Sequence, residues 1–350
     1  MLRLERIDAN SDWGAGLGAF PDAHVYQTPA WLRFLTESQG GEPVVAALRD
    51  DGRTVGYFTG LLICKFGLRI LGSPFPGWST PYMGLNLMPG VERRDALTLL
   101  VRFAFSELKC AHFEMVDLHA TLENASGLAL EHTMHPTCVI DLTASEEDLR
   151  AGMKRSVRWS IRKAEKSGVT IEEAHDLQFA DEFFAQLQDV YAKQQLVPPF
   201  DAERIRAMIR ILEPAGMLLM LRARNAEGLS IATGLCPFYN HTLFGPWNAS
   251  WRQHQYLCPN EALHWYAIGW ARRHGIVHCN MVGNKEFKKK FGGYETSSPL
   301  LGKSRNRLIA VLRRSAPVAM TSLLRLMRLL QRDKAASGRG AVPSPLSSEG

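Results

Sequence analysis

Two stretches far apart in the sequence carry the same hairpin pattern. Gly52-x-x-Val55-Gly56 opens a long apolar run in the first half of the chain, and Gly228-x-x-Ile231-Ala232 opens one in the second half. A shorter apolar segment precedes each run, and a helical pattern and a further strand pattern follow it. This repeated element order predicts a tandem duplication of one α/β unit, and 350 residues are enough for two domains.

The hydrophobic periodicity places the elements of the two units. In the first unit we expect a helix at 28–39, strands at 44–48 and 54–66, a helix at 92–109 and a strand at 112–118. In the second unit we expect helices at 177–192, 201–212 and 260–274, and strands at 217–222, 230–239, 243–247 and 276–281. We predict domains at 1–145 and 146–304, a basic amphipathic helical region at 305–334, and a disordered Ser-, Gly- and Pro-rich tail at 335–350.

The most informative stretch lies near the end of the second unit. Asn260 is a suitable N-cap for the helix, and Gly275 suits its C-terminal end. A short strand and then a basic loop, Gly283 to Gly293, follow. A helix, a strand and a basic loop in this order suit an enzyme that holds an acyl donor and stabilises negative charge developing on it.

Two segments of this unit resemble a known family. Pro259-Asn260-x-x-Leu263-His264-Trp265 with Phe287-Lys288-x-x-Phe291-Gly292 resembles the C-terminal signature of FemAB-like acyltransferases, which belong to the GNAT superfamily and have CelD-like relatives in polysaccharide clusters. The run from Arg155 to Val169 is similar to the R-x-x-I-R-K-A-E-K-x-G-V helix of the same family. The resemblance implies an α/β fold with mixed sheets, tandem GNAT-like (acyl-CoA N-acyltransferase) domains and acyl transfer.

Lys288 is the first candidate for a catalytic residue. Its ammonium follows a glycine turn and lies beside an aromatic residue, where it could stabilise charge on a thioester or ester oxygen. The resemblance implies that this lysine lies at the end of the acyl donor, with Asn284 and Phe287 as donor-binding neighbours. The alternative is a basic loop that is simply exposed to solvent.

A second candidate group consists of Arg155, Arg158 and Arg162, which share one face of a helix. They could bind a phosphate of CoA, of a nucleotide-linked substrate or of tRNA. The alternative is a charged, solvated helix face. DNA is not expected as a partner, because we expect no aromatic residues interleaved with this cluster.

A third group lies at the end of the long strand of the second unit. In GNAT folds this strand separates from its neighbour, so Trp247 and Asn248 are candidates for donor binding. Tyr239 or His241 could serve as the acid or base near neutral pH. The alternative is an aromatic cluster that fills the core.

The identity of the acyl donor stays open at this point. Simple acetyltransferases bind the CoA pyrophosphate with a Gly-rich loop before the long helix, whereas this chain has Gln255 to Asn260 there, without glycine. Asn260 is nevertheless a candidate for donor binding. FemAB-like enzymes also lack the loop, so the donor is either acyl-CoA, such as acetyl-CoA, or an aminoacyl-tRNA.

Other classes of site are disfavoured by the motifs. The pairs His132/His135 and His274/His278 lack further ligands at suitable spacing, so no metal site is expected. Motifs for a serine hydrolase, a P-loop or a Rossmann fold are missing from the sequence. We therefore expect direct transfer between two bound substrates.

The composition is that of an ordinary globular protein, with 46% hydrophobic and 22% charged residues. The net charge of +6 favours anionic partners, and six scattered cysteines suggest reduced thiols. We expect a cytoplasmic enzyme, in contact with the inner face of an anionic membrane if its basic C-terminal helix docks there.

Three functions remain as hypotheses. The first is transfer of an acyl group to an amine or hydroxyl of a polar acceptor, such as a cell-envelope or polysaccharide precursor. The second is an aminoacyl-tRNA-dependent peptidyltransferase. The third is a non-catalytic, peripheral scaffold.

Overall fold

The first half of the chain supplies seven strands. In the computed structural model, which describes every residue except 79, 194–195, 312 and 314–350, they are β1 (Arg3–Ile7), β2 (Glu42–Asp50), β3 (Arg53–Lys65), β4 (Leu68–Ser73), β5 (Gly84–Leu87), β6 (His112–Val116) and β7 (Glu131–Asp141). The helical elements are η1 (Trp13–Ala19), η2 (Val25–Gln27), α1 (Pro29–Gln39), α2 (Arg93–Arg102), the π-helical turn η3 (Phe103–Glu107) and α3 (Leu122–Ala125).

The second half supplies another set of elements. Its strands are β8 (Thr170–Glu173), β9 (Leu218–Arg224), β10 (Ser230–Tyr239), β11 (Thr242–Phe244), β12 (Trp247–Ser250), β13 (His278–Asn280) and β14 (Tyr294–Ser304). Its helices are α4 (Glu146–Gly152), α5 (Arg155–Lys166), α6 (Phe179–Lys193), α7 (Ala202–Leu212), η4 (Arg252–Leu257), α8 (Pro259–Arg273) and α9 (Glu286–Lys289).

All these strands form one mixed sheet, and its order reads the same from either edge. The order is β1-β2-β3-β4-β6-β14-β7-β13-β11-β10-β9-β8, with β5 also paired to β3 and β12 also paired to β10. From the outside inward, β1 corresponds to β8, β2 to β9, β3 to β10, β4 to β11 and β6 to β13. Both β4–β6 and β11–β13 are parallel pairs joined through a helix. The predicted duplication is therefore confirmed as an internal symmetry of the sheet.

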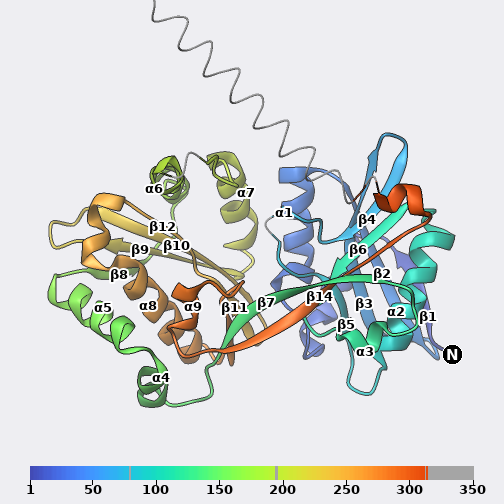
Figure 1. Cartoon of the computed structure of the whole chain (residues 1–350), viewed down its shortest axis with the longest axis horizontal. Helices are drawn as coiled ribbons and strands as arrows, with labels where there is room; N and C mark the ends of the chain where they lie inside the picture. Colours follow the sequence, from blue (N-terminus) through green and yellow to red (C-terminus); the bar gives the residue numbers. More distant parts are fainter. Residues whose placement is uncertain (79, 194–195, 312, 314–350) are drawn as a thin grey trace, which may run out of the picture. The chain divides into compact units, whose positions relative to one another are not determined.

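The two central strands are exchanged between the halves. Strand β7 follows β6 in the sequence but pairs with β13, and β14 follows β13 but lies beside β6. The two pair antiparallel with each other from Tyr294↔Val139 to Gly302↔Glu131. They form a long ribbon that crosses from one half to the other (Figure 1). Neither strand was predicted from the sequence.

Helices cover both faces of the sheet. On one face, α1, α6 and α7 enclose a core that draws on both halves and contains Trp31, Phe183 and Phe244 (Figure 1). On the other face, α5 and α8 cover the second half over a core around Ile161 and Leu263, and α2 covers the first half. This layered α/β arrangement confirms the predicted fold class.

Local signals in the sequence set most element ends correctly. Thr28 caps the helix expected at 28–39 by accepting the N–H of Trp31, and Pro29 occupies the first position of α1. The helix expected at 260–274 instead begins at Pro259 after Cys258, which has a left-handed conformation. Asn260 is therefore not the N-cap, because its side chain is engaged elsewhere.

Residues Met1–Lys303 form one compact unit, and the described residues from Ser304 onward lie outside it. The domain boundary between 145 and 146 remains a prediction. The basic helical region expected at 305–334 lies largely outside the described residues, and the tail expected at 335–350 lies wholly outside them. The six cysteines are free, and four of them are buried.

Candidate acyl-transfer site

The site begins where one strand changes its partner. The N–H of Gly245 donates to the carbonyl of Asn280 (3.0 Å), which is the last link between this strand and β13. Pro246 then provides the bend, and β12 continues beside β10 alone, with Trp247 opposite Leu235. The two neighbouring strands therefore separate after Phe244. The expected strand separation is present, but it lies beyond β11 and not at Tyr239.

A cavity of about 280 Å³ lies at this separation, and it is lined by both halves of the chain. Its walls are Thr80 and Pro81 from the first half and Phe200, Trp247 and Val282 from the second. The rings of Phe200 and Trp247 stack 5.5 Å apart. Thr80 is held in place because its hydroxyl accepts the indole N–H of Trp31 (3.1 Å). The cavity is mainly apolar and aromatic, as ligand pockets commonly are.

The wall at Val282 is fixed by a network of hydrogen bonds. Val282 has a φ of +52°, which is unusual for a β-branched residue. Its N–H donates to Oδ1 of Asn280 (2.9 Å), which also accepts the hydroxyl of Thr137 (2.8 Å). The hydroxyl of Thr137 accepts the N–H of Gly283 (3.1 Å). These bonds hold the chain in its strained turn directly beside the cavity.

Lys288 supports the same turn from behind. Its ammonium donates to the carbonyls of Met281 and Val282. Burial and the charge of Lys285 lower the pKa of Lys288 to about 8. The two carbonyl acceptors favour the charged form, because they replace water as hydrogen-bond partners. Lys288 is thus a partly buried cation whose charge is directed at the backbone of the cavity wall.

Phe287, the second predicted residue of this loop, packs on a buried histidine. Its ring lies 5.2 Å from that of His264, which also stacks on Phe291. Burial lowers the pKa of His264 to about 4, and its Nδ1 lies 2.8 Å from the carbonyl of Asn260. The imidazole is therefore neutral and donates from Nδ1. Its Nε2 is buried and has no hydrogen-bond partner among the described residues. His264 belongs to the motif that resembles FemAB-like enzymes, but no role was predicted for it.

Asn248 and Asn260 are brought together at the start of α8. The amide of Asn248 donates to Oδ1 of Asn260 (2.6 Å), and the amide of Asn260 donates to the hydroxyl of Ser250 (3.1 Å). Asn284 lies elsewhere, beside Glu295, where its hydrogen bond helps to lower the pKa of that carboxyl group after the larger effect of Lys289. Whether these residues bind a donor remains a prediction.

Tyr239 and His241 lie at the opposite end of β11 from the cavity. Tyr239 pairs with Thr242, and burial raises the pKa of its phenol. The side chain of His241 is exposed in the turn between β10 and β11. Neither residue lines the described cavity at Trp247. Their proposed acid–base role remains a prediction that this geometry does not support.

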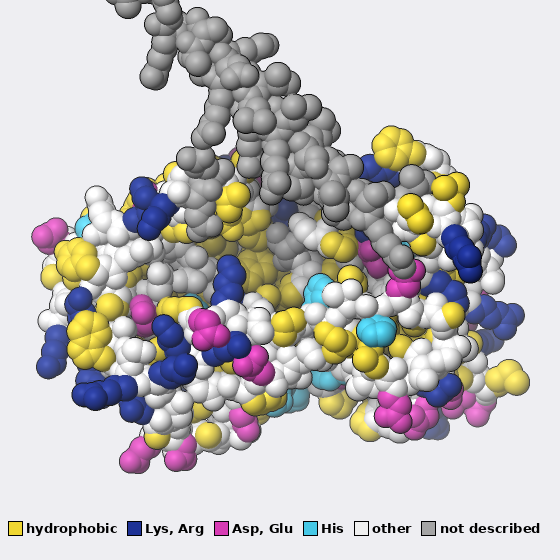
Figure 2. Space-filling model, in the orientation of Figure 1, with side chains coloured by type: hydrophobic (Ala, Val, Ile, Leu, Met, Phe, Trp, Pro, Cys, Tyr) yellow, Lys and Arg dark blue, Asp and Glu magenta, His cyan; other side chains and the backbone are white. Residues whose placement is uncertain are grey.

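The three arginines of α5 divide into two kinds. Arg158 donates to the carbonyls of Arg150 (3.2 Å) and Ala151 (2.8 Å) and so caps the end of α4. Arg155 and Arg162 are exposed. Lys and Arg side chains gather over the region of α5 (Figure 2). The expectation that this cluster lacks aromatic residues is wrong, because Trp159 is 60% exposed on the same helix.

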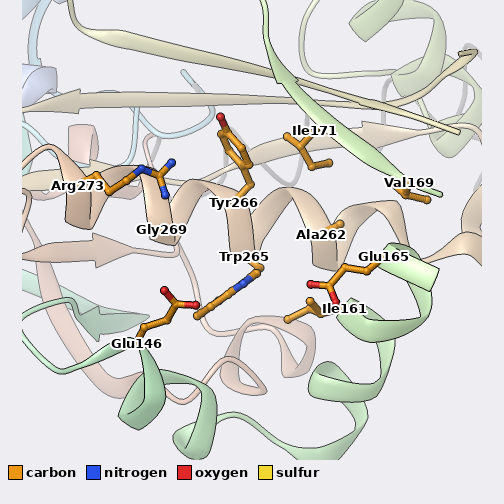
Figure 3. Close-up of a pocket in the computed structure, with 10 residues that line it drawn as sticks. All are labelled: Glu146, Ile161, Glu165, Val169, Ile171, Ala262, Trp265, Tyr266, Gly269 and Arg273. Carbon is orange, nitrogen blue, oxygen red and sulfur yellow. The ribbon is translucent and has the colours of Figure 1, made fainter. Parts of the chain in front are cut away.

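A second cavity of about 210 Å³ lies outside α8, between α5 and β8. Trp265 and Tyr266 project into it from α8, while Ile161 and Glu165 reach it from α5 (Figure 3). The guanidinium of Arg150 lies 4.4 Å from the centre of the Trp265 ring and pairs with Glu146. The charged residues that line this cavity are Glu146, which pairs with Arg150, together with Glu165 and Arg273.

Several residues of the first cavity were not predicted as site residues. Thr80 and Pro81 belong to a loop of the first half whose aromatic residues Phe75 and Tyr82 are buried. Phe200 and Val282 carry no motif, because the cavity unites segments that are distant in sequence.

The comparison with protein families decides the class of the second half. Residues 151–289 match the model described as an acetyltransferase (GNAT) domain. Residues 151–289 therefore form a GNAT domain. This finding confirms the predicted superfamily and the expectation of an enzyme that transfers acyl groups. No curated protein sequence matches the chain.

Solved structures extend the fold comparison to most of the chain. FemX has a TM-score of 0.72 at 14% identity, over 89% of this chain and 99% of that one. A tandem GNAT protein from the clavulanic acid biosynthesis pathway has a TM-score of 0.53 at 12% identity, over 87% and 99%. The C-terminal DUF2156 domain of an Agrobacterium fabrum protein named as a lysylphosphatidylglycerol synthetase has 0.53 at 13%, over 80% and 89%. At these identities the likeness establishes the tandem fold alone.

Two further findings concern the described residues. None of their helices combines the length and the apolar character that crossing a membrane requires. Within the same residues, no group of three or more His, Cys, Asp or Glu side chains lies in a position to hold a metal ion.

Proposed function

We propose that the protein transfers an acyl group to an amine or hydroxyl at the cavity between β12 and the Val282 turn. The observation that carries this proposal is the cavity itself, which adjoins the separated strands of the GNAT domain and is lined on one side by Thr80 and Pro81 from the first half. The donor would enter between the separated strands, and the acceptor would lie against Trp247 and Phe200.

The transfer needs few chemical groups from the protein. The acceptor nitrogen or oxygen attacks the acyl carbon, a bond forms between them, and the bond from that carbon to the donor sulfur or oxygen breaks. The acceptor loses a proton, and the leaving group gains one. Holding the two substrates in one apolar cavity supplies most of the rate enhancement, because it makes the attack intramolecular in effect.

Lys288 acts in this proposal as a positioning residue. Its ammonium holds the carbonyls of Met281 and Val282, and so fixes the wall against which the acyl group would lie. A cation behind this wall also favours negative charge on the donor oxygen during attack. The stacked aromatic wall suits a sugar ring or another flat, partly apolar portion of a polar acceptor, such as an envelope or polysaccharide precursor.

Acetyl-CoA or another acyl-CoA is the first candidate donor. The test is release of free CoA thiol from acetyl-CoA with a panel of amino sugars and hydroxyl acceptors. We expect an acceptor-dependent rate that falls about 100-fold in Trp247→Ala, since a lost positioning contact can cost that much. The matched control is Phe66→Ala, an aromatic residue that is 92% exposed in the first half. Equal activity of Trp247→Ala and the wild type would remove the cavity from the proposal.

An aminoacyl-tRNA is the second candidate donor, and one observation favours it. The start of α8 has Pro259 without an N–H, and Asn248, Ser250 and Asn260 bond one another there. This end is poorly suited to the pyrophosphate of CoA. Mass spectrometry of the small molecules and RNA that co-purify with the protein distinguishes the two donors. Absence of both, together with no transfer from either, would contradict acyl transfer at this cavity.

A further inference from the structure

One face of α5 combines an exposed tryptophan with four cations. Trp159 is 60% exposed. One cation lies four residues before Trp159, and the others lie three, four and seven residues after it. At these spacings all four cations share one side of the helix with Trp159. They are Arg155, Arg162, Lys163 and Lys166. The acidic residue of the helix, Glu165, is directed toward the cavity beside α8 (Figure 3). The outer face is therefore positively charged throughout.

The helix is held firmly in this orientation. Its opposite side, with Val157, Ile161 and Ala164, is buried in the core of the second half. Packing against α8 fixes which residues face outward. An exposed tryptophan costs free energy in water, because much of its apolar surface remains hydrated. A partner that covers this ring would remove that cost, and the cations around it favour an anionic partner.

We propose that this face of α5 docks on an anionic lipid membrane. Trp159 would enter the headgroup region, where indole rings are favoured, and the four cations would contact acidic headgroups around it. Charge complementarity selects this partner, because the face presents cations and no carboxylate. Docking would keep the enzyme beside acceptors that are attached to the membrane.

The ring geometry favours a membrane over nucleic acid. The ammonium of Lys163 lies 5.1 Å from the centre of the Trp159 ring and so occupies one of its faces. Stacking of successive bases requires open aromatic faces along a groove. Insertion of the ring edge into a headgroup layer requires neither open ring faces nor a groove. A ring of cations around one projecting indole therefore matches a lipid surface better than a single strand of RNA.

The experiment measures sedimentation of the full chain with vesicles. One set contains 30% phosphatidylglycerol in phosphatidylcholine, and the other contains phosphatidylcholine alone. We expect binding to the first set only, reduced by high salt. Trp159→Ser and the double variant Lys163→Glu, Lys166→Glu should each weaken binding to the acidic vesicles by about tenfold. The first variant removes the inserted apolar ring, and the second replaces two cations that attract acidic headgroups. Circular dichroism and thermal unfolding verify that both variants fold.

The chain offers a matched control at the other end of the molecule. Phe66 is 92% exposed, and the ammonium of Lys65 lies 5.8 Å from its ring. The variants Phe66→Ser and Lys65→Glu should bind vesicles as the wild type does. The proposal is overturned if the wild type does not bind acidic vesicles, or if the α5 variants bind them normally. It is also overturned if the α5 variants lose binding to total tRNA while keeping their vesicle binding.

Discussion

The two halves of the chain contain equivalent bends, one after β4 and one after β11. The bend of the first half is filled by protein, whereas the bend of the second half lies beside a cavity. In the first half, ten residues separate β4 from β5, whereas in the second half only Gly245 and Pro246 separate β11 from β12. Asp117 lies two residues beyond Met115, the partner of the last residue of β4. Val282 lies two residues beyond Asn280, the partner of the last residue of β11. Asp117 and Val282 thus occupy equivalent places.

The bend of the first half is closed. Gly84 packs so tightly there that a Cβ atom on it would lie 2.7 Å from the Cβ of Asp117. The carboxylate of Asp117 is buried, accepts the N–H of Leu85 and pairs with Arg93, which also pairs with Asp22. The extra loop of the first half fills its own bend and sends Thr80 and Pro81 to the cavity of the other half. The loop of the first half therefore forms part of the wall of the cavity in the second half.

The largest effect is expected from breaking the closed bend. Arg93→Met would leave the buried carboxylates of Asp22 and Asp117 without their cation, at a cost of about 3–5 kcal/mol in the free energy of unfolding. Urea denaturation measures this loss. The neighbouring exposed residue provides the control, because Arg94→Ala should change stability by at most about 0.5 kcal/mol. A loss below about 1 kcal/mol in Arg93→Met would mean that this ion network does not close the first half.

The variant Lys288→Met tests the bend of the second half, where Lys288 contacts the cavity wall. The pKa of Lys288 is about 8 in the folded protein against 10.5 as its reference value. Between these values the unfolded chain binds more protons than the folded protein. The free energy of unfolding of the wild type should therefore rise with pH across this window, relative to Lys288→Met, by at most about 3 kcal/mol.

Activity provides the second measurement on this variant. Turnover of the wild type should fall as pH rises through about 8, because the cation behind Met281 and Val282 loses its proton. Lys288→Met should lack this step, and Lys288→Arg should move it to higher pH. Identical pH profiles for the wild type and Lys288→Met would show that the lysine has no part in positioning the wall.

A smaller effect is expected from Thr137→Val, which removes one hydroxyl and keeps the shape. The N–H of Gly283 and Oδ1 of Asn280 would each lose a partner, at a cost of about 1–2 kcal/mol. Chemical denaturation measures this change, and KM for the acyl donor should rise with it. Thr133 lies exposed on the same strand, so Thr133→Val is the matched control. Equal stability of the two variants would contradict the role given to Thr137.

Elements that depend on local signals could be predicted from the sequence. The hairpin at Gly52, the cap at Thr28 and the helices of the second half follow from patterns within a few residues, and the structure confirms them. The exchanged strands did not follow. The first residues of β7 are exposed and polar, and both β7 and β14 contain a proline, Pro136 and Pro299. They become strands because each pairs with the other, which no local pattern reports.

The candidate site was predictable only in part. The motif around Lys288 indicated the loop whose lysine contacts the cavity wall, and Trp247 lies at the separated strands, while the roles of both residues remain predictions. The sequence could not place the splitting point at Gly245, because it depends on which strand lies beside β11. Nor could it place Thr80 and Phe200 in one wall, since that requires the packing of both halves.

Hydrogen–deuterium exchange with bound donor shows which of the two bends binds the acyl donor. The measurement compares the free protein with samples that contain saturating acetyl-CoA or, in parallel, an aminoacylated tRNA. The account predicts that one of the two donors slows exchange at 245–250 and 281–284, while the equivalent segments 84–87 and 115–118 stay unchanged. Slowed exchange at the first-half segments, with none at the second-half bend, would contradict the assignment of acyl transfer to the open copy.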